Sequence, residues 1–335
     1  MRVLVLGGSV FLSRAVAQAH RARADDVTCL VRNADGRLPS GVRAVSADRA
    51  RGVGAYDEVL GSWDAVVDVA TDPRFVRDAL EALSARARHW TYVSSCSVYR
   101  DQDHVALDES SATVDPIFEG DARSPENYAA AKSACESLCR DARGEHLSVV
   151  RPGLIVGAGD PSDRGGYWPM RFVRDDLPVL VPTAASCAAQ LIDVRDVAQW
   201  IVRCDVDALT GAINAVGDVR GLRELLEETR ALLGHRGAVV EAADEWLVER
   251  GVSPWSGPES FPMWIPTGAG LDGFLRRSNA TARAHEMSLR PLSETIAEIV
   301  AYERERGLSR ERAAGLSARR EGELLAELGA LGALG

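Results

Sequence analysis

The chain begins with a short apolar segment, a pair of glycines and a helical pattern, and this succession constrains the fold more than any other feature. Val3 to Leu6 is an aliphatic run of strand length, Gly7 and Gly8 form a turn, and apolar residues recur at helical spacing from Phe11 to Val16. A strand that passes through a glycine turn into a helix is the start of a βαβ unit. We therefore expect a parallel sheet with helices packed against it.

Strands and helices continue to alternate along the first half of the chain. The apolar spacing between Phe75 and Leu83 predicts one helix. A longer helix is expected to start at Ser124-Pro125-Glu126 and to carry Tyr128, ending at about Arg143. Further strands are predicted over residues 27–31, 42–45, 65–69, 90–93 and 148–150. This alternation predicts an α/β fold with a Rossmann-type, doubly wound parallel sheet.

The pattern becomes irregular after residue 157, where a stretch rich in Gly, Pro and Asp begins. We therefore expect a Rossmann lobe over residues 1–165, to which 190–216 return as a strand and a helix. A smaller mixed α/β lobe is expected from residues 166–189 and 217–300. Residues 301–335 alternate Arg with Glu and predict a solvated C-terminal helical tail.

Charge and hydropathy exclude several classes of protein. Acidic residues outnumber basic ones by 49 to 39, and the net charge of −10 disfavours nucleic acid and anionic membranes, which need a basic face. The longest apolar run near the start, Val3 to Leu6, is far shorter than the ~20 residues of a membrane span. We expect a cytoplasmic protein whose partner is a small molecule, with no nucleic acid and no membrane.

The cysteines and histidines do not form a metal-binding pattern. The six cysteines include no Cys-x-x-Cys pair, and Cys135 and Cys139, one helical turn apart, would need further ligands. No histidine lies within four residues of another. We expect reduced core thiols and no metal site.

One basic residue differs from all the others. The 39 basic residues comprise 38 arginines and one lysine, Lys132, which follows Tyr128 by four positions. Arginine replaces lysine at little cost on a surface, whereas some sites require a compact ammonium. On a helix this spacing places the phenol and the ammonium on one face. A nearby cation lowers the pKa of a phenol from about 10, so Tyr128 becomes usable as an acid or base.

A hydroxyl opposite this pair would complete a catalytic site. Ser95 follows the strand predicted over 90–93, and active sites in such sheets gather at the carboxyl ends of the strands. Ser95 would hold a carbonyl or alcohol oxygen of the substrate. Ordinary loop hydrogen bonding is the alternative role.

The turn after the first strand is a candidate cofactor site. Its backbone N–H groups and the dipole of the following helix would face a nucleotide pyrophosphate, although a tight turn without a ligand is the alternative. The candidate cofactor-binding residues of this turn are Gly7, Gly8, Ser9, Val10, Phe11 and Leu12.

Two residues, one after the second strand and one after the third, would face the adenosine half of the cofactor. An acidic residue after the second strand would favour NAD, but the chain has Arg32, which pairs better with a 2′-phosphate. We therefore expect NADP in preference to NAD, with a merely solvated arginine as the alternative. Asp48, after the third strand, either accepts a bond from the adenine amino group or serves as a turn residue.

Together these motifs resemble the extended short-chain dehydrogenase/reductase superfamily. More narrowly, they resemble its NAD-dependent epimerase/dehydratase group and the actinobacterial reductase-like branch of that group. The matching segments, in order over about residues 1 to 300, are Gly-Gly-Ser-x-Phe-Leu at 7–12, Val-Ser-Ser-x-Ser-Val-Tyr at 93–99, Tyr-x-x-x-Lys at 128–132, Arg-Pro-Gly-x-Ile-x-Gly at 151–157 and Ile-Asp-Val-x-Asp-Val-Ala at 192–198.

The resemblance implies a role for each candidate residue. Tyr128 would serve as the acid/base, Lys132 would lower its pKa and hold the nicotinamide ribose, and Ser95 would orient the substrate oxygen. The second lobe would bind the substrate. A homodimer formed by stacked helices of the first lobe is common in the superfamily.

The chain departs from the family pattern at several positions. Val10 and Ser13 stand where glycine is usual, which predicts a poorer approach of the backbone to the pyrophosphate. Cys96 and Ser97 replace the Asp-Glu of sugar-nucleotide dehydratases, so dehydration is not expected. Leu154 stands where many nucleotide-sugar enzymes carry an asparagine that binds the diphosphate, which disfavours a nucleotide sugar.

We therefore predict an NAD(P)-dependent oxidoreductase that moves hydride between nicotinamide and a carbonyl or secondary alcohol of a small metabolite. A nucleotide-sugar epimerase of the same superfamily is the alternative among enzymes, and a non-catalytic NAD(P)-binding sensor is the alternative outside them. Trp168, Trp255 and Trp264 either line an apolar substrate pocket or simply pack in the second lobe.

Overall fold

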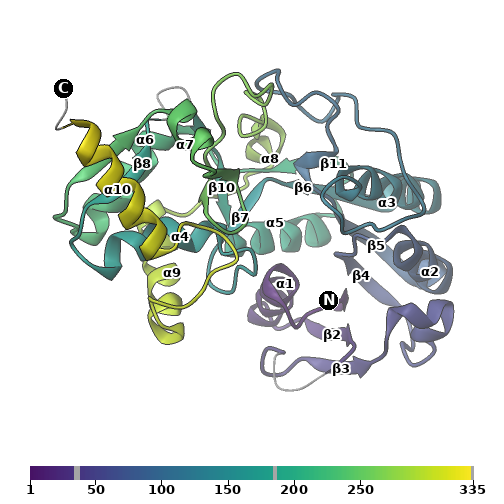
Figure 1. The fold of residues 1–335 in the computed structure, drawn as a ribbon. Coiled ribbons are helices and arrows are strands. Elements are labelled where there is room, and N and C mark those ends of the chain that lie inside the picture. Colours follow the sequence, from purple (N-terminus) through teal and green to yellow (C-terminus); the bar gives the residue numbers. More distant parts are fainter. Residues whose placement is uncertain (34–37, 184–186, 333–335) are drawn as a thin grey trace.

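The structure, a computed structural model, describes residues 1–33, 38–183 and 187–332 and is built around a seven-stranded sheet (Figure 1). The strand order is β11-β6-β5-β4-β1-β2-β3, and every neighbouring pair is parallel. The strands are β1 (Arg2–Leu6), β2 (Asp26–Val31), β3 (Arg43–Ser46), β4 (Trp63–Asp68), β5 (Ala87–Val93), β6 (Leu147–Pro152) and β11 (Gly211–Ala215). The predicted Rossmann-type sheet is thereby confirmed.

Strand β1 shows why this sheet needs helices on both faces. Its side chains alternate between two cores, with Val3 and Val5 in one and Leu4 and Leu6 in the other. The first core also contains residues of α1 (Phe11–Ala22) and α5 (Val194–Asp207), and the second contains residues of α2 (Pro73–Leu83) and α3 (Tyr128–Arg143). The chain order reverses between β1 and β4, so a crevice for a ligand is expected at the carboxyl ends of these strands.

The return of the chain to the first lobe differs in detail from the prediction. Residues 191–193 form β10 (Leu191–Asp193), which pairs with β7 (Leu154–Val156) outside the large sheet. The strand that joins the sheet is β11, which the sequence analysis did not predict. It is short and begins at a glycine, so its pattern is weak.

The second lobe is a mixture of short strand pairs and helices around its own apolar core. Figure 1 shows it beside the sheet, on the side of β7 and β10. Its strands are β8 (Val179–Pro182), β9 (Ala188–Ala189), β12 (Arg220–Gly221), β13 (Val239–Ala242), β14 (Ser253–Trp255) and β15 (Ser260–Pro262). The helices after α3, apart from α5, are α4 (Arg164–Arg174), α6 (Leu222–Leu233), α7 (Asp244–Glu249), α8 (Ala280–Ala284), α9 (Leu292–Arg306) and α10 (Ala318–Gly332).

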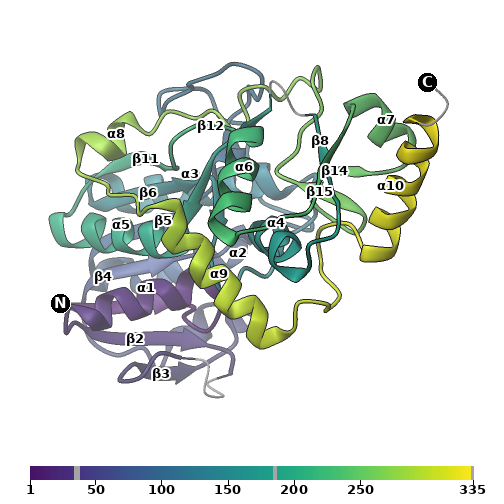
Figure 2. The ribbon, with the colours of Figure 1, turned by 90° about the vertical axis from the view of Figure 1, so that its left-hand side faces the viewer.

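The C-terminal helix α10 is docked on the second lobe, far from the N-terminus (Figure 2). Leu324 is completely buried in the second core. Glu321, also buried, accepts hydrogen bonds from Arg171 Nε at 2.6 Å and from the Leu180 backbone N–H at 3.1 Å. The prediction of a solvated tail is therefore wrong, because part of its charge pattern makes buried ion pairs.

Of the three tryptophans of the second lobe, two pack in its core and one is partly exposed. Trp168 and Trp264 are buried in the core, and their indole N–H groups donate to Pro262 O and to Asp244. Trp255 remains partly exposed, so it is the one of the three that can line a pocket.

All six cysteines are free thiols, and five of them are buried. Among the described residues, no group of three His, Cys, Asp or Glu side chains is arranged to hold a metal ion. Over the same residues, no helix has the length and apolar character needed to cross a membrane.

Candidate active site

Helix α3 carries a row of polar residues spaced one turn apart. They are Tyr128, Lys132, Glu136 and Arg140, so they share one face of the helix. Lys132 and Glu136 are buried, whereas Tyr128 at the first turn is partly exposed. The helix therefore presents a phenol at its open end and directs two charged groups into the protein.

The Lys132 ammonium is anchored to the carboxyl ends of two neighbouring strands. Its Nζ donates to the carbonyl oxygens of Val93 at 2.7 Å and Ala70 at 3.0 Å, and it lies 5.0 Å from the centre of the Tyr92 ring. Val93 ends β5, and Ala70 follows β4. No described residue accepts the third N–H of the ammonium, so that donor is available to a ligand in the crevice.

Tyr128 opens α3 beside the second lobe. Its backbone N–H donates to Ser124 O at 3.0 Å, which fixes the first turn of the helix. Its phenol interacts electrostatically with Arg164, the first residue of α4. The structure thus places Tyr128 one helical turn from Lys132, at the junction between the two lobes.

Ser95 lies immediately beyond β5 and caps the short 3-10 helix η3 (Cys96–Val98). Its Oγ accepts a hydrogen bond from the Ser97 backbone N–H at 3.1 Å and contacts Ser97 Oγ at the same distance. The side chain is half-buried at the carboxyl edge of the sheet. The loop role considered for Ser95 is therefore present, and its position matches the one expected of a substrate-orienting hydroxyl.

Beneath these residues lies a buried ion pair that the sequence analysis missed. Glu136 on α3 accepts from Arg151 at the end of β6, with distances of 2.9 Å to Nε and 2.7 Å to Nη2. Ser94, which precedes Ser95, donates its hydroxyl to Glu136 at 2.5 Å. Burial alone would raise the pKa of the Glu136 carboxyl, but the hydrogen bonds and charge of Arg151 outweigh it and hold this pKa below its ordinary value.

The network continues from Arg151 in β6 to Asn214 in the neighbouring strand β11. Arg151 Nη1 donates to the Tyr99 hydroxyl at 3.1 Å, and this hydroxyl donates to Asn214 Oδ1 at 2.6 Å. The Asn214 backbone N–H in turn donates to Glu109 at 2.8 Å. The spacing of Glu136 four residues after Lys132 was a signal in the sequence, but its partner Arg151 lies on another element.

The glycine turn after β1 is shaped by close packing. Gly7 and Gly8 have φ values of 135° and 124°, and a Cβ at Gly8 would lie 2.3 Å from the sulfur of Cys29 in β2. Phe11 has a φ of 36°, which is a strained value for a residue with a side chain. The chain therefore turns tightly against β2 before it enters α1.

Ser13 stabilises this turn in place of the glycine usual at that position. Its hydroxyl accepts a hydrogen bond from the Gly8 N–H at 3.0 Å and donates to Val10 O at 2.8 Å. The first-turn N–H groups of α1, from Phe11 to Ser13, find no acceptor among the described residues, and Val10 provides no side-chain cap. These donors and the helix dipole fit a diphosphate, and the half-exposed Val10 side chain stands beside them.

The two residues expected near the adenosine behave differently. Arg32 follows β2 at the carboxyl edge of the sheet and is exposed. Asp48 is also exposed, and its carboxylate caps the 3-10 helix η1 (Arg49–Tyr56) by accepting from the Ala50 N–H at 3.0 Å. The turn role is thus realised for Asp48, while Arg32 remains accessible to a ligand.

A groove of about 730 Å³ runs beside the glycine turn, between α1, α5 and α9. Its lining includes Ser9, Val10 and Phe11 but not Ser95, Tyr128 or Lys132. It therefore borders the candidate cofactor turn, and the candidate catalytic residues lie elsewhere.

Comparison with known families places this site in context. Residues 53–206 match the model of the NAD dependent epimerase/dehydratase family. This segment of the chain is thus similar to the NAD dependent epimerase/dehydratase family. The matched segment contains Ser95, Tyr128 and Lys132 and begins after the glycine turn, where Val10 and Ser13 depart from the usual pattern.

Solved structures share the fold over about nine tenths of the chain. A putative epimerase from Burkholderia cenocepacia aligns with a TM-score of 0.65 and 22% identity, over 90% of this chain and 98% of its own. UDP-N-acetylglucosamine 4-epimerase from Bacillus cereus aligns with a TM-score of 0.63 and 15% identity, over 90% and 99%. The Bordetella bronchiseptica enzyme WbmH in complex with NAD⁺ aligns with a TM-score of 0.60 and 20% identity, over 91% and 98%. No curated protein matches the sequence significantly.

The family that residues 53–206 match is described as NAD-dependent. The residues of this chain fit such a cofactor. The uncapped start of α1 and the free N–H of Lys132 both lie at the carboxyl ends of the parallel strands, where a dinucleotide binds in a sheet of this kind. The assignment to an actinobacterial branch remains a prediction, as do the individual roles of Ser95, Tyr128 and Lys132.

Proposed function

We propose that the protein is an NAD(P)-dependent oxidoreductase that transfers hydride between nicotinamide and a carbonyl or secondary alcohol carbon of a small metabolite. The observation that carries this proposal is the anchoring of Lys132 to Val93 O and Ala70 O. It fixes the only lysine of the chain at the carboxyl edge of the sheet, one turn from Tyr128. The anchor Val93 is the last residue of β5, two positions before Ser95.

When bound, the nicotinamide supplies or accepts the hydride. Tyr128 gives its phenolic proton to the substrate oxygen during reduction and takes a proton from the alcohol in the reverse direction. The third N–H of the Lys132 ammonium holds a ribose hydroxyl. Ser95 donates a hydrogen bond that orients the same substrate oxygen. Glu136, Arg151 and Ser94 keep α3 and the Ser95 segment in register.

NADP is the proposed form of the cofactor. The support is the exposed Arg32 directly after β2, where the adenosine ribose lies in a sheet of this topology. A guanidinium there binds a 2′-phosphate through charge-assisted hydrogen bonds. The homodimer and the cytoplasmic location stay predictions.

A nucleotide-sugar epimerase is the second candidate, because several of the structural neighbours are named as such enzymes. In that case the hydride would be removed from a sugar hydroxyl and returned to the other face. The Leu154 side chain is buried in the core of the second lobe, so no diphosphate contact is expected at its position. This disfavours the epimerase candidate.

A two-stage experiment tests the proposal. Thermal shifts with NAD, NADP and their reduced forms measure cofactor binding, since a bound ligand raises the apparent melting temperature. Turnover of ketones, secondary alcohols and UDP-sugars is then followed at the absorbance of reduced nicotinamide, about 340 nm. A net absorbance change supports the oxidoreductase, sugar interconversion without one supports the epimerase, and binding without turnover supports the sensor.

A further inference from the structure

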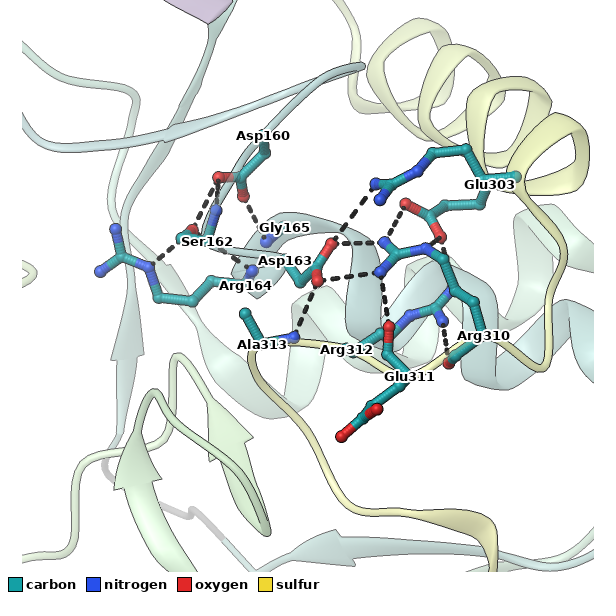
Figure 3. A network of polar contacts seen from close by, with 11 residues as sticks. Asp160, Ser162, Asp163, Arg164, Gly165, Glu303, Arg310, Glu311, Arg312 and Ala313 are labelled. Carbon is teal, nitrogen blue, oxygen red and sulfur yellow. Dashed lines mark hydrogen bonds and ion pairs between the residues drawn. The ribbon is translucent and has the colours of Figure 1, made fainter.

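Arg164, the first residue of α4, carries an incompletely paired guanidinium. Its Nε donates to Ser162 Oγ at 3.0 Å, and its Cζ lies 4.8 Å from the centre of the Trp255 ring. No described residue accepts a hydrogen bond from either terminal nitrogen. Figure 3 shows both nitrogens directed away from the neighbouring polar network.

The surrounding arginines differ from Arg164 in this respect. Four of them pair with a carboxylate, namely Arg171 with Glu321, Arg174 with Asp175, Arg310 with Asp163 and Arg312 with Glu303. A partly buried guanidinium without such a partner carries a desolvation cost that an anionic ligand would offset.

The acidic residue nearest in the chain does not fill this role. Asp160 accepts hydrogen bonds from the Ser162 N–H at 2.8 Å, from Ser162 Oγ at 2.7 Å and from the Gly165 N–H at 3.1 Å. Its carboxylate is therefore occupied by the loop itself. Burial lowers the pKa of Arg164, and the charges of Asp160 and Tyr128 oppose that shift only in part.

The position of Arg164 connects it with the candidate active site. Its charge interacts with the Tyr128 phenol, the proposed acid/base. The loop that leads to Arg164 passes the glycine turn, because a Cβ at Gly159 would lie 3.9 Å from the Phe11 ring. The guanidinium therefore lies where the second lobe faces the crevice of the sheet.

The loop that carries Arg164 is held firmly from behind. Asp163 has a φ of 57°, and its carboxylate accepts from Arg310 and from the Ala313 N–H at 2.8 Å instead of capping α4 (Figure 3). On the other side, the Trp255 ring that supports the guanidinium packs against Phe274, with ring centres 5.0 Å apart. The terminal nitrogens are thus pre-positioned, which lowers the entropy lost on binding.

We infer that Arg164 binds an anionic group of the substrate, a carboxylate or a phosphate, and so determines which carbonyl compounds the enzyme accepts. Two guanidinium nitrogens match the paired oxygens of either group. The inference rests on the proposed function, since the anionic group would belong to the molecule whose oxygen Tyr128 protonates.

Calorimetric titration of the full chain tests this inference, with and without NADP. The probes are malonate, inorganic phosphate and malonamide, the uncharged counterpart of malonate. We expect at least one of the anions to bind and malonamide not to bind. Arg164→Gln should weaken anion binding about tenfold or more, equivalent to about 1.4 kcal/mol, and Arg164→Lys should weaken it less. The exposed Arg88 serves for the control, Arg88→Gln, which should bind as the wild type does.

Three results would overturn the inference: anion binding by Arg164→Gln that equals the wild type, equal binding of malonamide, or no anion binding at all. Melting temperatures of both Arg164 variants identify any loss of folding. Failure of NADP to bind would instead count against the proposed function, while the titrations without NADP still decide the role of Arg164. Comparison of malonate with phosphate shows which anion the site prefers.

Discussion

The Glu136 carboxylate and the Arg151 guanidinium face each other in two hydrogen bonds of 2.9 and 2.7 Å, with both side chains at least 98% removed from solvent. This pair ties the middle of α3 to the end of β6. Since the Ser94 hydroxyl also donates to Glu136, the helix with Tyr128 and Lys132 and the segment with Ser95 share one anchor.

Glu136→Gln should destabilise the protein by about 3–5 kcal/mol, because it leaves the Arg151 charge buried without a counter-ion. It should also lower turnover through displacement of Ser95 and Tyr128. Urea unfolding measures the first effect, and kcat the second. The exposed Glu145 offers a control, Glu145→Gln, with little expected change. Equal stability of the two variants would show that the ion pair does not hold the site.

Tyr128→Phe should reduce turnover by about 10²- to 10⁴-fold, the usual contribution of a positioned acid or base. The phenol hydroxyl has no hydrogen bond to a described residue, so its removal should leave the surrounding structure unchanged. Binding of NADP should therefore stay nearly intact. Steady-state rates and cofactor titration check both outcomes. Tyr302→Phe, on α9, is the matched control. Turnover that survives the Tyr128 change would remove this residue from the proposed mechanism.

Arg32→Asp should shift the preference from NADP towards NAD, because a carboxylate accepts hydrogen bonds from the ribose hydroxyls and repels a 2′-phosphate. Separate titrations with NAD and NADP give the ratio of dissociation constants. Arg88→Asp is the control for a change of surface charge. An unchanged ratio would place Arg32 outside the cofactor site.

Val10→Gly should tighten dinucleotide binding, by up to about tenfold or about 1.4 kcal/mol. The half-exposed Val10 side chain stands at the start of α1, beside the free N–H groups of its first turn. Its removal lets a diphosphate approach the backbone more closely. Calorimetry with NADP measures the change, and Val219→Gly, at another exposed valine, is the control. Weaker binding in Val10→Gly would mean that the valine itself supports the turn.

His20 should make the stability of the protein dependent on pH. The buried ring lies between Asp25 and Asp205, with nitrogen to oxygen distances of 2.9 and 3.0 Å. Burial alone would lower the pKa of His20, but the hydrogen bonds and charges of the two carboxylates outweigh it and raise this pKa above 6.5. The charged ring therefore adds stability that is full below about pH 6.5 and is lost as pH rises through the folded-state pKa.

This predicts that His20→Gln costs more stability at about pH 6 than at about pH 9. Urea unfolding at both pH values measures the difference from the wild type. His146→Gln, at an exposed position, should show no such trend. A cost that grows with pH would indicate that the ring is neutral in the folded protein.

Much of the first lobe could be predicted from sequence because its signals are local. The helix expected to carry Tyr128 and to end at about Arg143 is α3, which ends at Arg143 and begins at Tyr128, a few residues after the expected start at 124–126. Its pattern could be recognised because it lies within the segment itself. The glycine turn was predicted for the same reason. In contrast, β11 has no clear pattern of its own and is recognised only by its pairing with β6.

The missed parts of the site depend on partners distant in the chain. Glu136 and Arg151 are separated by 15 positions, and Arg171 and Glu321 by 150. Whether a charged residue pairs with a neighbour, with solvent or with a ligand is decided by tertiary structure. The sequence therefore predicted Tyr128 and Lys132 on one face of α3 but not the buried anchor beneath them, and the paired charges of the tail were expected to be solvated.

The docking of α10 also has a consequence for synthesis. Leu316 and Leu324 belong to the core of the second lobe, and Glu321 neutralises Arg171 of α4, which the ribosome releases much earlier. Until α10 emerges, the nascent second lobe has an open core and an arginine without this partner, whereas the strands of the large sheet are already available. We expect the growing chain to gain affinity for a dinucleotide first and to complete its second lobe last.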